Sequence, residues 1–382
     1  MTWRLLFIWV VLVLTTNVQA AEPIEIGVSL GLTGTYSRPA KMQERGYRLW
    51  ETHINRRGGL LGRPVRVVIR DDKSDSAEAI KIYRDLIAKR RVHLVFGPYS
   101  SEISEAVAPV LEDSGYPTVL PGAAADRIWQ NGYTNVFGLF TPASKYALEM
   151  LRLAVLYDLR RIAIVYADDA FSVEVAKGAK KWAHLANREV VLFEGFEKGT
   201  HDLHYLAIKT RQARADLLVT AGHFDESVDM RRALKAEGWY PRAYFATIGP
   251  TLQRYGEVVK QDAELTFAPS LWEPDESLEF TGSRKFIRAF LRDYGILPSY
   301  HAANAYAAGQ VIEEVVTNAN SLDRKKIRQA LYKLDTTVAI GRYQVDRFGV
   351  PVKHRPLIIQ WLDGKKEIVW PEEHRTAQPV FR

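Results

Sequence analysis

Short apolar runs alternate along this chain with longer segments in which apolar residues recur every three or four positions. Residues 24–30, 65–69 and 92–96 are runs of the first kind and are rich in β-branched side chains, whereas residues 77–88 follow the second spacing. Short β-branched runs predict strands, and a repeat of three to four positions predicts helices. Because the two kinds alternate, the pattern predicts βαβ units, parallel sheets and an α/β fold.

The same alternation begins again after residue 140 and continues to about residue 267. The segments that follow are long enough to return to either half. We therefore predict two Rossmann-like, doubly wound lobes with a ligand cleft between them, since open parallel sheets bind ligands beyond the carboxyl ends of their strands. The expected division is a signal peptide at 1–20, a first lobe of 21–140 plus 273–340, and a second lobe of 141–272 plus 341–382.

Two strand-to-helix turns follow each other in the first half of the chain. The first offers Ser100 or Ser101 as a helix cap, and the second is Pro121-Gly122 followed by the small-residue turn Ala123-Ala124-Ala125. Unpaired N–H groups and serine hydroxyls at such turns bind small anions, most simply a carboxylate. An ordinary capped helix in an α/β sheet gives the same pattern, so this stretch alone leaves both interpretations open.

Aromatic side chains recur near the ends of the predicted strands. They are Tyr36, Tyr99, Phe171, Phe224 and Trp272. Each of them could pack in a core by itself, but together at the cleft ends of strands they would form an apolar wall for a ligand's side group. All five are candidate ligand-binding residues.

The first twenty residues have the pattern of an export signal. Arg4 gives a positive start, residues 5–14 are apolar, and Val18-Gln19-Ala20 fits a small-residue cleavage site. The sequence holds no cysteine, which excludes disulfides, thiol catalysis and a lipidated cysteine. No later stretch approaches the roughly 20 apolar residues of a membrane-spanning helix. We expect an exported, soluble periplasmic protein without a lipid anchor.

Composition and charge narrow the possible partners. The chain has 382 residues, 47% of them hydrophobic, which is enough for two domains with substantial cores. The formal net charge is +7, but the basic pairs are scattered along the chain and form no concentrated stripe. This distribution argues against nucleic-acid binding and leaves a mild long-range preference for anionic solutes.

Motifs for catalysis and metal binding are weak or missing. The sequence has no GxSxG, P-loop, GxGxxG or HExxH pattern. His201 and His204 lack a nearby third ligand and fit a solvated loop better than a metal site. The aspartate pairs at 71–72 and 168–169 fit turns and helix caps better than paired catalytic carboxylates, because adjacent side chains of an extended segment point apart. We expect no enzyme, no cofactor and no metal.

A set of short motifs runs the length of the chain. They are Ile26-Gly27-Val28-Ser29-Leu30, Thr33-Gly34, Ile54-Asn55-Arg56-Arg57-Gly58-Gly59, Leu61-Gly62-Arg63-Pro64, Asp71-Asp72-Lys73-Ser74-Asp75, Gly97-Pro98-Tyr99-Ser100-Ser101, Ala108-Pro109-Val110, Ile162-Ala163-Ile164-Val165-Tyr166 and Tyr306-Ala307-Ala308-Gly309-Gln310. Each motif is modest alone. In this order they resemble the type I periplasmic solute-binding proteins of the branched-chain amino-acid transporter group, and the likeness spans essentially the whole mature chain.

The resemblance implies two lobes that are joined by three crossovers and close on a solute like a hinged trap. It also implies a monomer that delivers the solute to the permease of an ABC-type transporter in the inner membrane. In such proteins the positions that match Ser101 and the turn 123–124 hold the ligand's carboxylate and amine. The positions that match Phe171 and His223 or Phe224 contribute ligand contacts from the second lobe.

This chain departs from the amino-acid-binding pattern of that group in two places. Ala124 stands where the group places a threonine hydroxyl, and no acidic residue follows the predicted strand at 244–247, where the chain continues with 248–251. A buried ammonium without a carboxylate partner is costly. A carboxylate without the amine, such as an aromatic acid, or an amide is therefore an alternative to an amino acid.

Three classes of function follow from these observations. The first is a transport protein that captures a small carboxylate or amino-acid-like solute. The second is a sensory module of the same fold for an amide or aromatic acid, and the third is an enzyme. The absence of a fused kinase and of later transmembrane segments favours transport over sensing.

Overall fold

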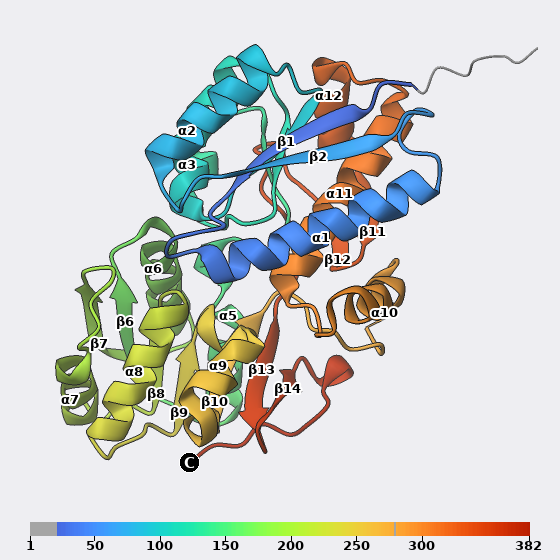
Figure 1. The fold of residues 1–382 in the computed structure, drawn as a ribbon. Helices are drawn as coiled ribbons and strands as arrows, with labels where there is room; N and C mark the ends of the chain where they lie inside the picture. The colour runs from blue at the N-terminus through green and yellow to red at the C-terminus, as the bar shows by residue number, and fades with distance from the viewer. Residues whose placement is uncertain (1–20, 279) are drawn as a thin grey trace, which may run out of the picture.

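The computed structural model describes residues 21–382 except residue 279, and it consists of two α/β lobes stacked on each other (Figure 1). The predicted signal peptide, residues 1–20, lies outside the described residues. Within the described chain, one five-stranded and one seven-stranded sheet form the centres of the two lobes. The prediction of an α/β fold with two lobes is confirmed.

The first lobe contains a parallel sheet in the order β2-β1-β3-β4-β5. Its strands are β1 (Ile24–Leu30), β2 (Val65–Asp71), β3 (Leu94–Phe96), β4 (Thr118–Leu120) and β5 (Val136–Gly138). Its main helices are α1 (Ser37–Arg56), α2 (Ser76–Arg84), α3 (Ser101–Asp113), α10 (Ser283–Tyr294), α11 (Tyr300–Ala319) and α12 (Arg324–Lys333). The chain leaves β1 toward β2 on one side and returns to β3 on the other. Right-handed crossovers therefore place α1 on one face and α2 and α3 on the opposite face, and α11 packs beside α1 (Figure 1).

The second lobe contains a mixed sheet in the order β14-β13-β10-β9-β8-β6-β7. Its strands are β6 (Arg161–Ala167), β7 (Glu189–Phe196), β8 (Leu217–Ala221), β9 (Ala243–Ala246), β10 (Thr266–Ser270), β13 (Leu357–Leu362) and β14 (Lys365–Trp370). Its main helices are α5 (Leu148–Leu156), α6 (Ala170–Leu185), α7 (His204–Gln212), α8 (Phe224–Ala236) and α9 (Gln253–Val259). The C-terminal hairpin adds the antiparallel edge, because β13 pairs antiparallel with both β10 and β14.

The chain passes between the two sheets three times, after β5, after β10 and before β13. His354 joins the three passages: its Nδ1 lies 2.9 Å from Thr141 Oγ1, and its Nε2 lies 2.9 Å from the Leu271 carbonyl oxygen. These contacts place the connection between the lobes at one compact point, as a hinge requires.

One detail differs from the expected division of the chain. The boundary drawn at 340/341 separates β11 (Asp335–Val338) from β12 (Gly341–Gln344), yet these strands pair antiparallel with each other. The Gly138 N–H of β5 also donates to the Gly349 carbonyl oxygen. The segment after residue 341 therefore remains with the first lobe until the passage at His354. The other lobe boundaries remain a prediction.

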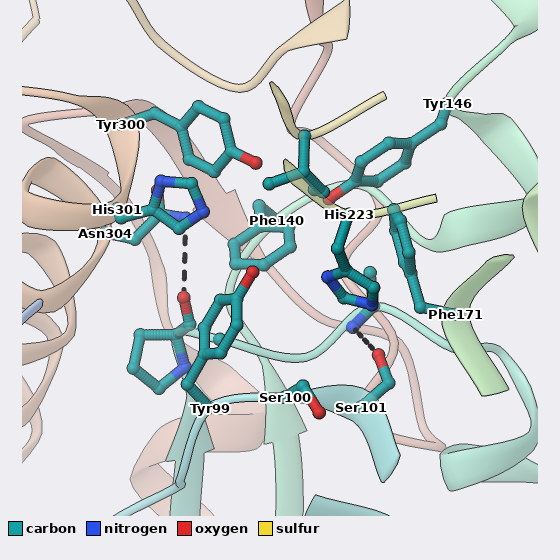
Figure 2. A pocket seen from close by; sticks show the side chains of 14 residues that line it. Tyr99, Ser100, Ser101, Phe140, Tyr146, Phe171, His223, Tyr300, His301 and Asn304 are labelled. Carbon is teal, nitrogen blue, oxygen red and sulfur yellow. Dashed lines mark hydrogen bonds between the residues drawn. The ribbon is translucent and has the colours of Figure 1, made fainter. Parts of the chain in front are cut away.

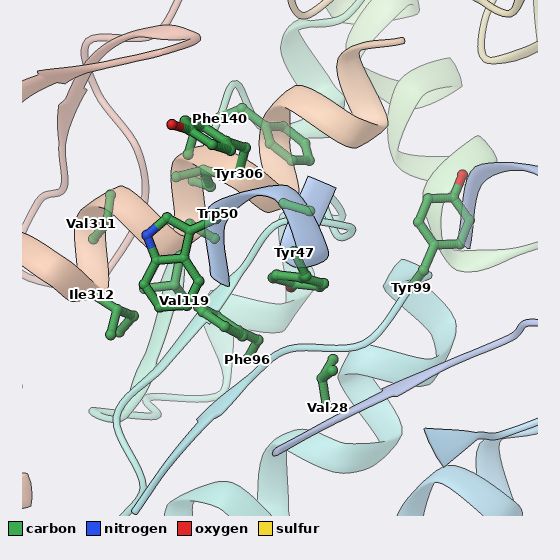
Figure 3. Close-up of a cluster of buried hydrophobic side chains, with 14 of the residues drawn as sticks. Val28, Tyr47, Trp50, Phe96, Tyr99, Val119, Phe140, Tyr306, Val311 and Ile312 are labelled. Carbon is green, nitrogen blue, oxygen red and sulfur yellow. The ribbon is translucent and has the colours of Figure 1, made fainter. Parts of the chain in front are cut away.

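Helix α11, which contributes residues to the cavity between the lobes, is held in position by close packing against α1. A Cβ atom on Gly46 would lie 2.1 Å from the Ala302 carbonyl oxygen, and one on Gly309 would lie 2.2 Å from the Trp50 ring. Both glycines are therefore needed for the two helix axes to approach this closely. Figure 3 shows Trp50 inside the cluster that joins α1, α11 and the sheet, where Tyr47 stacks on Phe96 at 4.6 Å between ring centroids. The first turn of α11 is thereby held at the edge facing the second lobe.

Candidate functional site

A small cavity lies between the lobes, where the turns at the carboxyl ends of both sheets face each other (Figure 2). The first lobe contributes the turns after β3 and β4 and the start of α11, and the second lobe contributes the starts of α6 and α8. The cavity volume is about 20 Å³, which leaves room for little more than one water molecule. A solute of amino-acid size therefore enters only if the lobes move apart or the lining side chains rearrange.

Ser101, the first residue of α3, ties the two predicted turns together. Its Oγ accepts hydrogen bonds from the N–H groups of Ala124 at 3.0 Å and Ala125 at 3.1 Å. These two N–H groups are therefore already paired and are not open to an anion, in contrast to the cradle of free N–H groups that the sequence suggested. The proton of the Ser101 hydroxyl remains available as a donor to the cavity.

Asp169 and His223 form a buried pair on the side of the second lobe. Asp169 caps α6 by accepting hydrogen bonds from the N–H groups of Phe171 and Ser172, and its Oδ1 lies 3.4 Å from His223 Nε2. Burial alone would raise the pKa of Asp169, but the His223 imidazole and the Ser172 hydroxyl hold that pKa well below its ordinary value. Burial alone would lower the pKa of His223, but the Asp169 carboxylate raises it above the ordinary value. The pair therefore shifts the protonation equilibrium of His223 toward an imidazolium beside a carboxylate.

The second ring nitrogen of His223 takes no part in this pair. His223 Nδ1 is buried and has no hydrogen-bond partner among the described residues. In the imidazolium form both ring nitrogens carry protons, and Nδ1 is then a charged donor. His223 and Ser101 line the same cavity, so an imidazolium and a hydroxyl are both available there to a carboxylate.

The first turn of α11 gives the opposite wall an uncharged character. His301 stacks on Tyr300 at 4.0 Å between ring centroids, and burial lowers the pKa of His301 to about 3. Asn304, one turn further along, donates to the Pro121 carbonyl oxygen at 3.4 Å. This wall therefore offers a neutral imidazole and an amide, and none of the described residues that line it is a carboxylate that could hold a proton on His301.

Aromatic rings fill most of the remaining surface of the cavity. Its rings come from Tyr99, Phe140, Tyr146, Phe171 and Tyr300. Tyr146 and Phe171 meet edge to face at 5.1 Å between centroids, which fixes both orientations. None of the described residues that line the cavity is an aspartate or a glutamate. The site thus combines an apolar wall with donors and neutral polar groups, and offers no direct anionic partner for an ammonium.

Most of the residues proposed from the sequence meet at this cavity. Those that line it are Tyr99, Ser100, Ser101, Gly122, Ala124, Phe171 and His223. They come from segments more than a hundred residues apart, and the facing sheet edges bring them together.

Four of the proposed residues do not line the cavity. Tyr36 lies behind it, with its ring 5.2 Å from that of His223 and 5.6 Å from that of Tyr99. Ala123 packs in a core cluster of the first lobe with Trp129.

The other two residues outside the lining pack elsewhere in the two lobes. The Trp272 ring packs on Phe286, and its Nε1 donates to Ser283 Oγ at 3.2 Å, which makes it a core residue of the first lobe. Phe224 faces away from the cavity and packs under the Arg38 guanidinium at 4.3 Å. Both residues lie at the ends of strands, as predicted. A position at a strand end does not determine where the side chain points, and neither side chain lines the cavity.

Six lining residues were not identified from the sequence. They are Phe140, Tyr146, Ile248, Tyr300, His301 and Asn304. A buried histidine in the first turn after a serine cap, as in Ser299-Tyr300-His301, is a pattern that could have identified the α11 contribution. The pairing of Asp169 with His223 had no such pattern, since these residues are 54 positions apart.

Two sets of polar contacts join the lobes at the mouth of the cavity. Lys198 of the second lobe lies 2.7 Å from Glu102 Oε2 and 2.8 Å from the Tyr36 hydroxyl. Arg38 of the first lobe lies 3.1 Å from Asp225 Oδ1 of the second. Because these pairs bridge the lobes, they can form only when the lobes are close together.

The remaining polar candidates of the sequence pair within their own lobes. His201 Nδ1 lies 2.8 Å from Asp229 Oδ2, and His204 Nε2 lies 2.9 Å from Glu237 Oε2. Across the described residues, no group of three or more His, Cys, Asp or Glu is arranged to hold a metal ion. In the same part of the chain no helix is both long and apolar enough to cross a membrane.

Comparison with known proteins places this geometry in context. The sequence profile of a family described as periplasmic binding protein matches residues 23–365. A Leu/Ile/Val-binding protein homologue from Brucella melitensis is 28% identical over 373 residues, which cover 92% of this chain and 93% of that protein.

Two solved structures share the fold at low sequence identity. One is a branched-chain amino acid transporter substrate-binding protein from Streptococcus pneumoniae in complex with isoleucine. It has a TM-score of 0.81 and 20% identity, and the match covers 94% of this chain and all of that one. The other is a solute-binding protein of an ABC transporter from R. palustris in complex with benzoate. It has a TM-score of 0.79 and 18% identity, and the match covers 93% of this chain and 99% of that one.

Proposed function

This chain belongs to the periplasmic binding protein family, and from that premise we propose that it captures a small carboxylate lacking an α-ammonium group for an ABC-type importer. The observation that carries the proposal is the buried Asp169–His223 pair, which favours the imidazolium form of a histidine that lines the cavity from the second lobe. The Ser101 hydroxyl adds a second donor from the first lobe. A carboxylate between them neutralises the imidazolium and accepts both protons.

The lining argues against an α-amino acid as the preferred solute. The segment Ile248–Thr251, in which the family's amino-acid binders would place an acidic residue, contributes only the apolar Ile248 to the cavity. A buried ammonium would meet the His223 imidazolium and no carboxylate of the described lining. Two like charges in one low-dielectric cavity repel each other, and each of them also loses its favourable hydration. An acid without the amine avoids both penalties.

The ligands of the two similar structures represent the two alternatives, an amino acid and an acid without an amine. Isoleucine, bound by one of them, carries both a carboxylate and an ammonium, whereas benzoate, bound by the other, carries only the carboxylate. Both share only the fold with this chain. Residues of this chain, above all Asp169 and His223, support the benzoate-like alternative.

Capture by lobe closure follows from the position of the cavity. It is enclosed by both lobes, and the contacts of Lys198 and Arg38 form only across the closed interface. We propose that the solute docks on the first lobe beside Ser101 and that closure adds His223 and Phe171. Small-angle scattering of the mature protein should show compaction when the bound acid is added, and unchanged dimensions at saturation would contradict closure.

The direct test compares each amino acid with its deaminated counterpart. The mature protein is unfolded and refolded to remove carried-over solute, and thermal unfolding is then measured with leucine against 4-methylpentanoate and phenylalanine against 3-phenylpropanoate. A ligand at about 100 times its dissociation constant adds about 2.7 kcal/mol to the free energy of unfolding. We expect the deaminated acids to raise the melting temperature more. A larger shift with leucine or phenylalanine would contradict the proposal.

Partner capture separates transport from sensing. We propose a periplasmic location and delivery to inner-membrane permease subunits, so crosslinking of the solute-loaded protein in membranes should recover an ABC permease. A sensor of the same fold would instead recover a signalling partner.

A further inference from the structure

The wall of the cavity opposite His223 holds a group of buried polar atoms without protein partners. They are Asn304 Oδ1 and both ring nitrogens of His301, and none of them has a hydrogen-bond partner among the described residues. The exposed fraction of the residue is 1% for His301 and 0% for Asn304. Both residues line the cavity between the lobes.

Such a concentration is unusual for the interior of a folded chain. More than nine in ten buried polar groups have a partner, and those without one reduce stability. Ser101, in the lining of the same cavity, shows how such an atom is satisfied when the protein supplies the partner, since its Oγ accepts two backbone N–H groups. His301 and Asn304 line the cavity, where a bound solute would reach their unpaired atoms.

The chemistry of these atoms indicates an uncharged partner. Burial keeps His301 neutral, and the positive charge of His223 lowers its pKa further. A neutral imidazole has one donor and one acceptor nitrogen, and Asn304 Oδ1 is an acceptor. A hydroxyl group, which donates one hydrogen bond and accepts others, matches this set.

We propose that His301 and Asn304 bind a hydroxyl group of the solute, so that the captured molecule is a hydroxy acid with its carboxylate toward His223 and its hydroxyl toward α11. This inference rests on the proposed function and specifies the solute class of the same cavity. The hydroxyl supplies the partners that the wall lacks, while the aromatic rings enclose the carbon frame. An acid with a methyl group in place of the hydroxyl leaves the polar atoms of His301 and Asn304 without hydrogen-bond partners. Binding sites that hydrogen-bond a hydroxyl group therefore bind the analogue without it much more weakly.

Matched acids test the proposal. Binding to the refolded mature protein is measured by calorimetry with 4-hydroxybenzoate, 4-methylbenzoate and benzoate, and with 4-hydroxypentanoate against 4-methylpentanoate. We expect the hydroxy acid to bind at least about tenfold more tightly than its methyl counterpart in at least one of the two sets. Equal or tighter binding of the methyl acid in both sets would overturn the proposal and assign the unpaired atoms to cavity water.

The panel also distinguishes this failure from failure of the proposed function. If the acids bind without a preference for the hydroxyl group, recognition of a hydroxyl is contradicted and capture of a carboxylate is not. If amino acids bind and no acid does, capture of a carboxylate without an amine is contradicted, and recognition of its hydroxyl group is contradicted with it.

Variants locate the preference on the α11 wall. In His301→Leu and Asn304→Leu the preference for the hydroxy acid should fall below about threefold while the methyl acid binds at least as tightly, because the apolar side chain no longer needs a partner. His184→Leu, an exposed histidine near the far end of α6, serves as the matched control and should keep the wild-type preference. Melting temperatures without ligand identify a variant that fails to fold, and the wild-type panel stands independently of the variants.

Discussion

Two buried histidines line the same cavity from opposite lobes, and their pKa values are shifted in opposite directions. The pKa of His223 lies above its ordinary value, whereas the pKa of His301 is lowered to about 3. Burial acts on both in the same direction, so the difference comes from the neighbours. Asp169 lies 3.4 Å from His223, while Tyr300 stacks on His301 and supplies no charge. One buried carboxylate therefore favours the cationic form of the histidine on one wall of the cleft, while the histidine on the other wall stays neutral.

This difference divides recognition between the lobes. The second lobe supplies the charge that attracts an anion, and the first lobe supplies uncharged polar atoms and the Ser101 hydroxyl. Closure brings both sets to one solute, so neither lobe alone holds the complete site.

The largest effect should come from removing the charge on the second-lobe wall. In Asp169→Asn the carboxylate beside His223 is lost, His223 becomes neutral, and the affinity for the bound acid should fall about 100-fold or more. The Asn side chain keeps an oxygen that can still cap α6, so the melting temperature should change less than the affinity. Calorimetry with the acid identified by the panel measures the change, and Ser172→Ala, which removes only one hydrogen bond to Asp169, is the control. Unchanged affinity in Asp169→Asn would mean that the charge of His223 has no part in binding.

The next effect concerns pH and has opposite signs for the two histidines. His301 has a folded-state pKa of about 3, below its ordinary 6.5. Its contribution to stability is thus present above pH 6.5 and is lost as the pH falls toward 3. His223 has a raised pKa, so its contribution is present below pH 6.5 and is lost as the pH rises through the folded value.

Denaturation of the ligand-free protein at pH 7 and at pH 5 measures how His301 contributes to the pH dependence of the free energy of unfolding. His301 alone should lower this free energy by about 2 kcal/mol between the two pH values. In His301→Leu this contribution should be absent. Burial also lowers the pKa values of His53 and His354 to about 4, so some acid sensitivity remains in the variant. An identical slope in wild type and variant would show that His301 is not held neutral by the fold.

A smaller effect should follow from giving the first-lobe wall a carboxylate of its own. Asn304→Asp places an acid one helical turn from His301 and on the same face of α11. The pKa of His301 should rise, as Asp169 raises that of His223, and an NMR titration of the ring reports it. The ratio of leucine to 4-methylpentanoate affinity should increase about tenfold, because an ammonium now has a partner. If the ratio does not change, the α11 wall does not contact the solute near its amine position.

The smallest effects should come from the contacts across the mouth of the cavity. Lys198→Ala removes the bridge to Glu102 and Tyr36. The affinity for the acid should fall about fivefold, since the closed form loses a partly buried charged hydrogen bond. Arg38→Ala breaks an exposed pair with Asp225 and should change affinity less than about twofold, with the effect disappearing in high salt. An equal loss in both variants would show that burial does not distinguish the two bridges.

The local pattern of the sequence was sufficient for the secondary structure and the class of fold. Alternating short apolar runs and helical repeats predicted the βαβ order of both lobes, because the periods of strands and helices are local properties. The same reasoning placed Ser100, Ser101 and Gly122 at turns of the cleft, since parallel strands present their carboxyl ends at one edge. The prediction that Asp169 caps a helix is also confirmed.

Only the tertiary structure decided which of these residues meet and in which charge state. Trp272 and Phe224 lie at the expected strand ends but point into cores, because side-chain direction depends on packing against distant segments. His301 and Asn304 reach the cavity because the glycines Gly46 and Gly309 allow α11 to pack closely against α1. The charge of His223 depends on a carboxylate 54 positions away. Periodicity is local and can be read along the chain, whereas burial and pairing depend on distances that exist only after the two lobes have folded and closed.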